Sequence, residues 1–277
     1  MALYATPPMA RIAERVKEFE QAGLAIPQEL TRLIEAWRVI SSGVNGTADT
    51  TAEHDKILAA AVDGDMETVR TTYLTLAAWR SVSRSDHAGP RDAVAKLLVD
   101  KARPLLHEVA AKGLPTLAKR FNTAARKLAE CGKAVTLDAD PGTLVGEDER
   151  VRTSWIHAPE HARVLDDLAP VITLSAVTLG YANGTGLAVQ RPPAALFVDP
   201  GEHDQGAILD AWEDTPHRLG KWGALVDMGV TIRAVSSLDE VTPIVRPPKP
   251  EIRYVRKRMP NGFTGMVPEE VPQPAAG

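Results

Sequence analysis

Apolar side chains recur at the spacing of an α-helix through most of the first 132 residues. In this pattern they fall three or four positions apart and form a stripe along one helical face. The stripes predict about six helices: two within residues 9–40, one around 57–62, one across 65–79 and two within 90–132. Amphipathic helices joined by short connectors are typical of an antiparallel bundle. We therefore expect a mainly α, helical-bundle N-terminal part.

Glycines mark the expected ends of the last two of these helices. The stripe that begins at Val94 is predicted to end at Gly113, because glycine is common just beyond a helix C-terminus. Pro104 lies inside this stripe and predicts a kink. The second stripe begins at Leu117 and is predicted to end at Gly132 for the same reason.

The pattern changes after residue 132. The predicted elements are a hairpin at 134–145, a short helix at 159–168, a strand at 171–178, a hairpin around Asn183-Gly184, a strand at 194–198, a helix at 208–226 that Pro216 can break, and a strand at 230–235. The β-branched residues of 171–178 favour strand over helix, and Asn-Gly favours a tight hairpin turn. A strand, a helix and a strand in that order predict one crossover unit in a small α+β domain.

Charge divides the chain in a similar way. The net charge of −4 is the sum of +3 over residues 1–135, −10 over 136–245 and +3 over 246–277. The last 32 residues contain seven prolines, which predict an extended Pro-rich tail. We therefore expect a helical bundle at 1–132, an acidic α+β domain at 133–245 and a basic tail at 246–277.

Cysteine and targeting signals limit the compartment. Cys131 is the only cysteine, so the chain can form no internal disulfide and no multi-cysteine zinc site. Residues 1–10 lack the apolar core of a signal peptide. Residues 168–190 carry no charge, but their proline, glycine and hydroxyl residues favour a buried core segment over a membrane span. We expect a cytoplasmic protein, or one assembled into a particle made in the cytoplasm. The richness in Ala, Arg, Val and Pro suggests a bacterial or phage gene.

Residues 157–161 match the H-x-x-E-H pattern of inverted zinc proteases. In those enzymes two histidines one helical turn apart bind zinc, and the glutamate activates water. In this chain the corresponding residues are His157, His161 and Glu160. Pro159 is most comfortable in a first helical turn, so we expect His157 to fall outside the helix and the metal geometry to be lost. A capped helix start with surface histidines is the favoured interpretation.

Asp199 to Asp204 form a second candidate metal site. Asp199, Glu202, His203 and Asp204 follow a predicted strand and precede a predicted helix, a position where ligands bind in crossover units. A turn whose carboxylates complement the positive end of the next helix is the favoured alternative. Gly180, Gly184 and Gly186 lack the spacing of a phosphate-binding loop.

The remaining candidate side chains are a cysteine and five tryptophans. Cys131 lies at a predicted helix C-terminus, where we expect a raised thiol pKa and a packing role. Trp37 and Trp79 lie on apolar stripes, while one of Trp155, Trp212 and Trp222 can mark a binding surface.

The basic tail contains the candidate interaction residues. They are Arg246, Lys249, Arg253, Tyr254, Arg256, Lys257 and Arg258. Residues 252–256 alternate like an edge strand, which permits pairing with a partner strand. The tail is also expected to attract acidic surfaces, including the acidic domain of its own chain or of a neighbouring copy. Nucleic acid phosphates are a further partner class, which the overall acidity does not favour.

We expect a non-enzymatic interaction or assembly protein that self-associates or binds a protein partner. No set of residues indicates a catalytic centre, a cofactor or a membrane partner. The alternative is a metal-dependent hydrolase or small-ligand enzyme that uses the Asp199–Asp204 loop, with His157 and His161.

Overall fold

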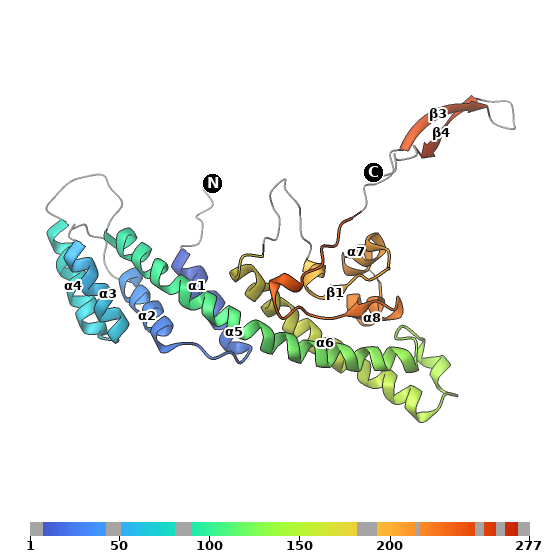
Figure 1. The fold of residues 1–277 in the computed structure, drawn as a ribbon, viewed down its shortest axis with the longest axis horizontal. Helices are drawn as coiled ribbons and strands as arrows, with labels where there is room; N and C mark the ends of the chain where they lie inside the picture. The colour runs from blue at the N-terminus through green and yellow to red at the C-terminus, as the bar shows by residue number, and fades with distance from the viewer. Residues whose placement is uncertain are drawn as a thin grey trace.

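The computed structural model describes residues 8–42, 51–80, 90–181, 193–213, 216–246, 252–258 and 264–270. Across these residues the chain is mainly helical, with two small two-stranded sheets (Figure 1). The helices are α1 Pro8–Gln21, α2 Gln28–Ser42, α3 Thr51–Asp63, α4 Met66–Arg80, α5 Pro90–Ala134, α6 Glu149–Thr178, α7 Gln205–Glu213 and α8 Gly220–Asp227. The strands are β1 Val198–Asp199, β2 Thr231–Ile232, β3 Ile252–Arg258 and β4 Thr264–Glu270.

Helix α5 is the central element of the fold. Its 45 residues correspond to about 68 Å at the usual helical rise, and Figure 1 shows it running beside both halves of the helical body. The predicted break at Gly113 is wrong, because α5 continues through it. Gly113 is instead a packing position, since a side chain there would overlap Leu24. Pro104 and Pro115 also lie inside the helix.

Helix α6 replaces two predicted elements. The short helix at 159–168 and the strand at 171–178 are one continuous helix of 30 residues, which Asp148 caps by accepting from the Val151 N–H. The hydroxyls of Thr173 and Thr178 donate to carbonyls one turn earlier, so these residues satisfy their polar groups within the helix. Burial of its apolar face against α5 outweighs the strand preference of the β-branched residues.

The buried side chains form two clusters that adjoin within α5. One cluster joins α1 to α4 with the first part of α5, up to Ala110. The other joins the rest of α5, from Leu114, with α6, α7, α8, β1 and β2. Leu24, Val171 and Leu179 pack against both clusters. The two halves of the molecule therefore share one continuous helical support.

The short elements after residue 134 differ from several predictions. The hairpin at 134–145 is instead a turn and a 3₁₀ helix, η1 Pro141–Leu144, capped by Asp140. The strand at 194–198 is mostly the 3₁₀ helix η2 Pro193–Leu196, which precedes β1. The interruption at Pro216 is confirmed, since α7 and α8 lie on either side of it.

The predicted crossover unit is wrong. Strand β1 pairs with β2 in antiparallel register, with Val198 opposite Ile232, whereas a crossover would make them parallel. Of the Asn183-Gly184 hairpin, Thr178 is helical, Leu179 and Gly180 form a turn, and residues 182–189 lie outside the described residues.

The expected extended tail is not confirmed. Strands β3 and β4 pair as an antiparallel hairpin, with Ile252 opposite Glu270 and Arg258 opposite Thr264. The strand predicted for residues 252–256 is confirmed as part of β3. Figure 1 shows this hairpin standing away from the helices.

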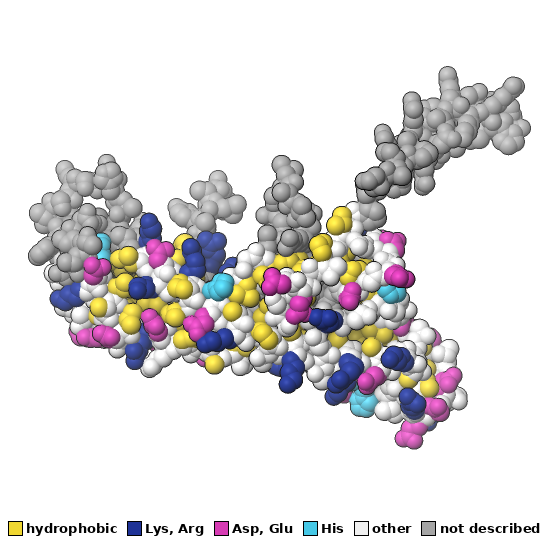
Figure 2. All heavy atoms as spheres, viewed as in Figure 1, with side chains coloured by type: hydrophobic (Ala, Val, Ile, Leu, Met, Phe, Trp, Pro, Cys, Tyr) yellow, Lys and Arg dark blue, Asp and Glu magenta, His cyan; other side chains and the backbone are white. Residues whose placement is uncertain are grey.

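Charged side chains are mixed on the surface. Figure 2 shows Lys and Arg interspersed with Asp and Glu along the visible face of the helical body. The charge blocks counted along the sequence do not separate there, because the basic second half of α5 packs against α6 and α8 of the acidic segment. Within the described residues, none of the helices is both long and apolar enough to cross a membrane.

Candidate functional site

The two histidines of the H-x-x-E-H match lie on the same helix. Helix α6 begins at Glu149 and includes Pro159, so the expectation that His157 falls outside the helix is wrong. The His157 Nδ1 lies 3.2 Å from the Glu160 Oε2, and both side chains are exposed. Burial lowers the pKa of His161, and the neighbouring Lys127 lowers it further.

The Asp199–Asp204 candidate lies in β1 and in the turn before α7. The Asp199 carboxylate accepts from the Gly201 N–H, and the Asp204 carboxylate accepts from the Gly206 N–H at the start of α7. Glu202 and His203 are exposed. Among the described residues, no three His, Cys, Asp or Glu side chains are placed to hold a metal ion. The residues of this loop therefore act as turn and helix-start residues in the structure.

Of the candidate tail residues, Arg246 has described side-chain contacts. Its guanidinium bonds to Asp210 at 2.5 Å and to Glu213 at 2.8 Å, two carboxylates one turn apart on α7. These bonds raise the pKa of Arg246, and the bond to Asp210 makes the largest contribution. The adjacent Val245 N–H donates to Gln205. Lys249 lies outside the described residues, while Arg253, Tyr254, Arg256, Lys257 and Arg258 lie in β3.

Sequence reasoning did not single out His217 and Asp227. The His217 Nε2 lies 3.1 Å from the Asp227 Oδ2, in the manner of an acid–base dyad. However, the His217 Nδ1 accepts from the Leu219 N–H, and the Asp227 Oδ1 accepts from the Leu137 N–H. Both ring nitrogens are thus occupied, and the side chain of His217 is only 6% exposed. This pair ties α8 to the end of α5 and leaves no ring nitrogen for a substrate.

Arg218 provides a second tie between these elements. Its guanidinium carbon lies 3.6 Å from the centre of the Trp155 ring, and its N–H groups donate to the Leu137 and Trp155 carbonyls. Its backbone N–H donates to Asp138. Burial lowers the pKa of Arg218, and Asp138 opposes that shift. Through these contacts with Leu137, Asp138 and Trp155, Arg218 joins the segment before α8 to the α5–α6 connection and to α6.

The other two tryptophans of the acidic segment belong to an aromatic cluster. Phe121, Phe197, Trp212 and Trp222 have ring centres 5.2 to 6.0 Å apart. The Trp222 Nε1–H donates to Asp166, and the Lys221 ammonium lies over both indole rings. Burial lowers the pKa of Lys221, and Asp166 opposes the shift. Trp222 is fully buried, so its main role is packing.

Cys131 also packs. Burial raises its thiol pKa, and Glu130 raises it further. The direction agrees with the expectation from its position at a helix end, although burial is the largest cause. A raised pKa keeps the thiol protonated and unreactive at neutral pH.

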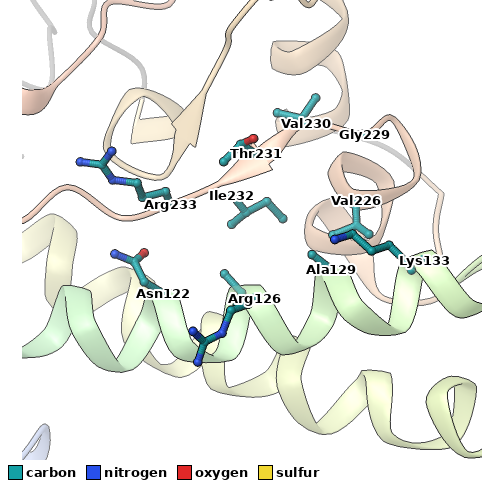
Figure 3. Close-up of a pocket in the computed structure, with 12 residues that line it drawn as sticks. Asn122, Arg126, Ala129, Lys133, Val226, Gly229, Val230, Thr231, Ile232 and Arg233 are labelled. Carbon is teal, nitrogen blue, oxygen red and sulfur yellow. The ribbon is translucent and has the colours of Figure 1, made fainter.

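One concave surface of the described residues is a groove between α5 and β2 (Figure 3). It has a volume of about 530 Å³. Its residues are Asn122, Ala125, Arg126, Ala129, Gly132 and Lys133 of α5, with Val226 and 229–233 opposite. Gly132 permits the close approach of α8, because a side chain there would overlap Val226. We call this surface the α5–β2 groove.

Asn122 forms one end of the α5–β2 groove. Its Nδ2 donates to the Ala234 carbonyl at 3.0 Å, and its Oδ1 accepts from the Ala234 N–H at 2.7 Å. An amide side chain thereby satisfies both backbone groups of one residue, as a neighbouring strand would. No sequence motif marks Asn122, because its partner lies 112 residues away.

Comparison with known proteins gives no assignment. The chain matches no protein-family model, no curated protein and no solved structure. Inference about function therefore depends on the surfaces described above.

Proposed function

We propose that this chain is an interaction or assembly protein whose helical body positions the C-terminal β3–β4 hairpin for binding to a protein partner. The observation that carries the proposal is the hairpin's attachment. Arg246 binds Asp210 and Glu213 of α7 just before the hairpin, and the hairpin itself stands away from the helices (Figure 1). The chain is therefore tied to α7 at Arg246, six positions before β3 begins at Ile252.

The energetics of a hairpin support a partner. An isolated two-stranded hairpin is marginally stable in water, and gains stability when it packs on a further surface. Strand β3 contains four Lys or Arg residues and no acidic residue, so an acidic partner surface would be attracted to it. Such charge complementarity raises the rate of association, and the effect weakens as salt rises.

The direct test is a chain that ends at Arg246. This deletion keeps the Arg246 contacts with α7 and removes the hairpin. We expect a lower mass in light scattering at low salt if the partner is a second copy. For a different partner, we expect loss of binding to an identified acidic protein. Unchanged mass and unchanged binding would contradict the proposal.

A charge variant separates the hairpin's basic residues from its backbone. Arg256→Glu with Arg258→Glu reverses two charges of β3 at positions that lie opposite Met266 and Thr264, away from the acidic residues of β4. We expect weaker association and a smaller dependence on salt. The control is Lys119→Glu with Lys127→Glu, which makes the same charge change on exposed side chains of α5.

A further inference from the structure

The exposed side of the second half of α5 is rich in lysine and arginine. Between residues 112 and 133 ten residues of α5 are exposed, of which six are Lys or Arg and one, Glu130, is acidic. Seven residues make close to two turns of helix, so side chains at this spacing start from one line along the helix, about 10.5 Å apart. Four of the six cations have this spacing, and we call them the basic stripe: Lys112, Lys119, Arg126 and Lys133.

The basic stripe lies on the side of α5 opposite its buried residues. Leu114, Phe121 and Leu128 are buried, and each follows a residue of the stripe by two positions. Because two residues turn a helix by about 200°, the stripe faces away from the core. Figure 3 shows Arg126 extending away from β2, and Lys133, at the end of the stripe, reaching toward Val226.

The cations of the stripe are available to an external anion. Lys119, Arg126 and Lys133 form no ion pair with any residue that the structure describes. Lys112 pairs with Glu108, but these side chains are 77% and 51% exposed, and exposed pairs of this kind contribute little to stability. At physiological salt a charge acts over about 8 Å. The local excess of cations therefore attracts an anion, although the net charge of the whole chain is −4.

The composition of this exposed side favours one class of partner. Its ten exposed residues include no aromatic residue, and Pro115 is the only apolar one among them. Protein interfaces depend on aromatic and apolar anchors, and a helix that lies on a membrane inserts an apolar face, whereas the apolar face of α5 is in the core. Single-stranded nucleic acids bind by stacking on aromatic side chains. The phosphates of a duplex, in contrast, are bound by cations alone.

We propose that the basic stripe of α5 binds the phosphate backbone of double-stranded nucleic acid without reading its base sequence. The stripe is about 32 Å long, close to the length of one duplex turn, about 34 Å. A duplex carries one negative charge for about every 1.7 Å of its axis, so the four cations meet phosphates whatever the sequence. This proposal does not depend on the β3–β4 hairpin, so each proposal can fail without the other.

The probe is a labelled DNA duplex of about 21 base pairs, or two turns, titrated with the full-length chain and followed by fluorescence anisotropy. We expect the logarithm of the binding constant to fall linearly with the logarithm of salt concentration. The expected slope is about −3.6, because each of four phosphate contacts contributes about −0.9. Lys119→Glu with Arg126→Glu should weaken binding about tenfold or more near about 50 mM salt, and should reduce the slope to about −1.8.

A second variant should act in the opposite direction. Glu130 is exposed on the same side of α5, between Arg126 and Lys133. Glu130→Lys replaces the one acidic residue of this side with a cation, so it should strengthen binding and steepen the slope by about one. A merely structural role of the stripe would not produce this gain.

Two control variants make the same charge change as the double stripe variant at other places. Lys17→Glu with Lys56→Glu alters exposed residues of α1 and α3, and Arg256→Glu with Arg258→Glu alters the β3–β4 hairpin. Both should bind the duplex as the wild type does. Thermal midpoints close to that of the wild type show that each variant is folded.

The proposal is overturned if the double stripe variant binds the duplex as tightly as the two controls, or if Glu130→Lys does not strengthen binding. Competition identifies the partner class. An unlabelled duplex should displace the probe, and a single strand should do so less well. Polyglutamate or phosphatidylserine vesicles that compete as well as the duplex would assign the stripe to an acidic protein or to a membrane, and would equally overturn the proposal.

Discussion

The two hydrophobic clusters of this chain are built in different ways. The N-terminal cluster joins helices α1 to α4, each of 13 to 15 residues, through stripes of apolar side chains such as Met9, Ile12, Val16 and Phe19 of α1. The C-terminal cluster places α7 and α8, of nine and eight residues, and two strands of two residues each, on the long helices α5 and α6.

This difference follows from the length of the elements. A helix of four or five turns can present a complete apolar stripe, whereas a helix of two turns has little stability of its own. The short elements are therefore fixed by specific contacts between residues distant in sequence. Examples are Trp222 with Asp166, His217 with Asp227 and Asn122 with Ala234. Substitutions at these contacts should affect the C-terminal region first.

The largest expected effect is that of Trp222→Ala. The Trp222 side chain is fully buried against Phe121, Phe197 and Trp212, so its loss should lower the free energy of unfolding by about 3–5 kcal/mol in denaturant titrations. We expect near-ultraviolet circular dichroism to be lost while much helical signal remains, because Trp222 belongs to the C-terminal cluster. Complete loss of helicity would show that the two clusters cannot be separated.

Gly223→Ala should have the next largest effect. A methyl group at this position of α8 would overlap the His217 ring, and overpacking of this kind costs about 1–3 kcal/mol. The measurement is the thermal midpoint of unfolding. Gly146→Ala is the control, because no atom lies within 4 Å of the added methyl group. Equal midpoints for the two variants would mean that His217 is free to move.

Asn122→Ala should lower the free energy of unfolding by about 1 kcal/mol. This value is near the lower end of the penalty for leaving a backbone group unpaired, because water in the groove can replace the lost hydrogen bonds. Hydrogen exchange at the Ala234 amide should become faster, and exchange in α1 to α4 should not change. The control is Thr123→Ala, which removes a bond within α5 alone. Unchanged exchange at Ala234 would contradict the role of Asn122 as a substitute strand.

The smallest effect concerns a local contact in the N-terminal region. The Thr68 hydroxyl, and then its backbone N–H, donate to Asp65 before α4 and hold the pKa of that carboxyl below its usual value. The unfolded chain therefore binds this proton at higher pH than the folded chain. The stabilisation is present above the unfolded pKa of about 3.9 and is lost as pH falls through the lower folded pKa.

Thermal midpoints between about pH 3 and pH 6 test this contact, over a range that spans the ordinary carboxyl pKa. Asp65→Ala should be less stable than the wild type near pH 6, and the difference should shrink toward pH 3. Asp55→Ala, which removes an exposed carboxylate on α3, is the control. A difference between Asp65→Ala and the wild type that does not change with pH would contradict the assignment.

Much of the N-terminal region could be predicted from the sequence. Met9, Ile12, Val16 and Phe19 recur at helical spacing in the sequence, and they are the buried residues of α1. The helical interruption at Pro216 and the strand at 252–256 were also predictable. These features depend on periodicity, proline geometry and residue type within a short window.

The candidate site could be predicted only in part. The sequence singled out Arg246, which does contact acidic residues of its own chain. It did not single out the α5–β2 groove, because that surface depends on the pairing of β1 with β2 and on the approach of β2 to α5. Neither His217 nor Asn122 belongs to a local motif.

The sequence by itself determined where amphipathic helices form, because a repeating apolar stripe has one favourable arrangement with its neighbours. Only the tertiary structure decided that α5 continues through Gly113 and that residues 171–178 are helical. At both places a local signal, a glycine or a run of β-branched residues, favours one conformation, while burial against a distant segment favours another. The free energy gained by burying apolar surface is larger than the local conformational preference, so packing determines the outcome.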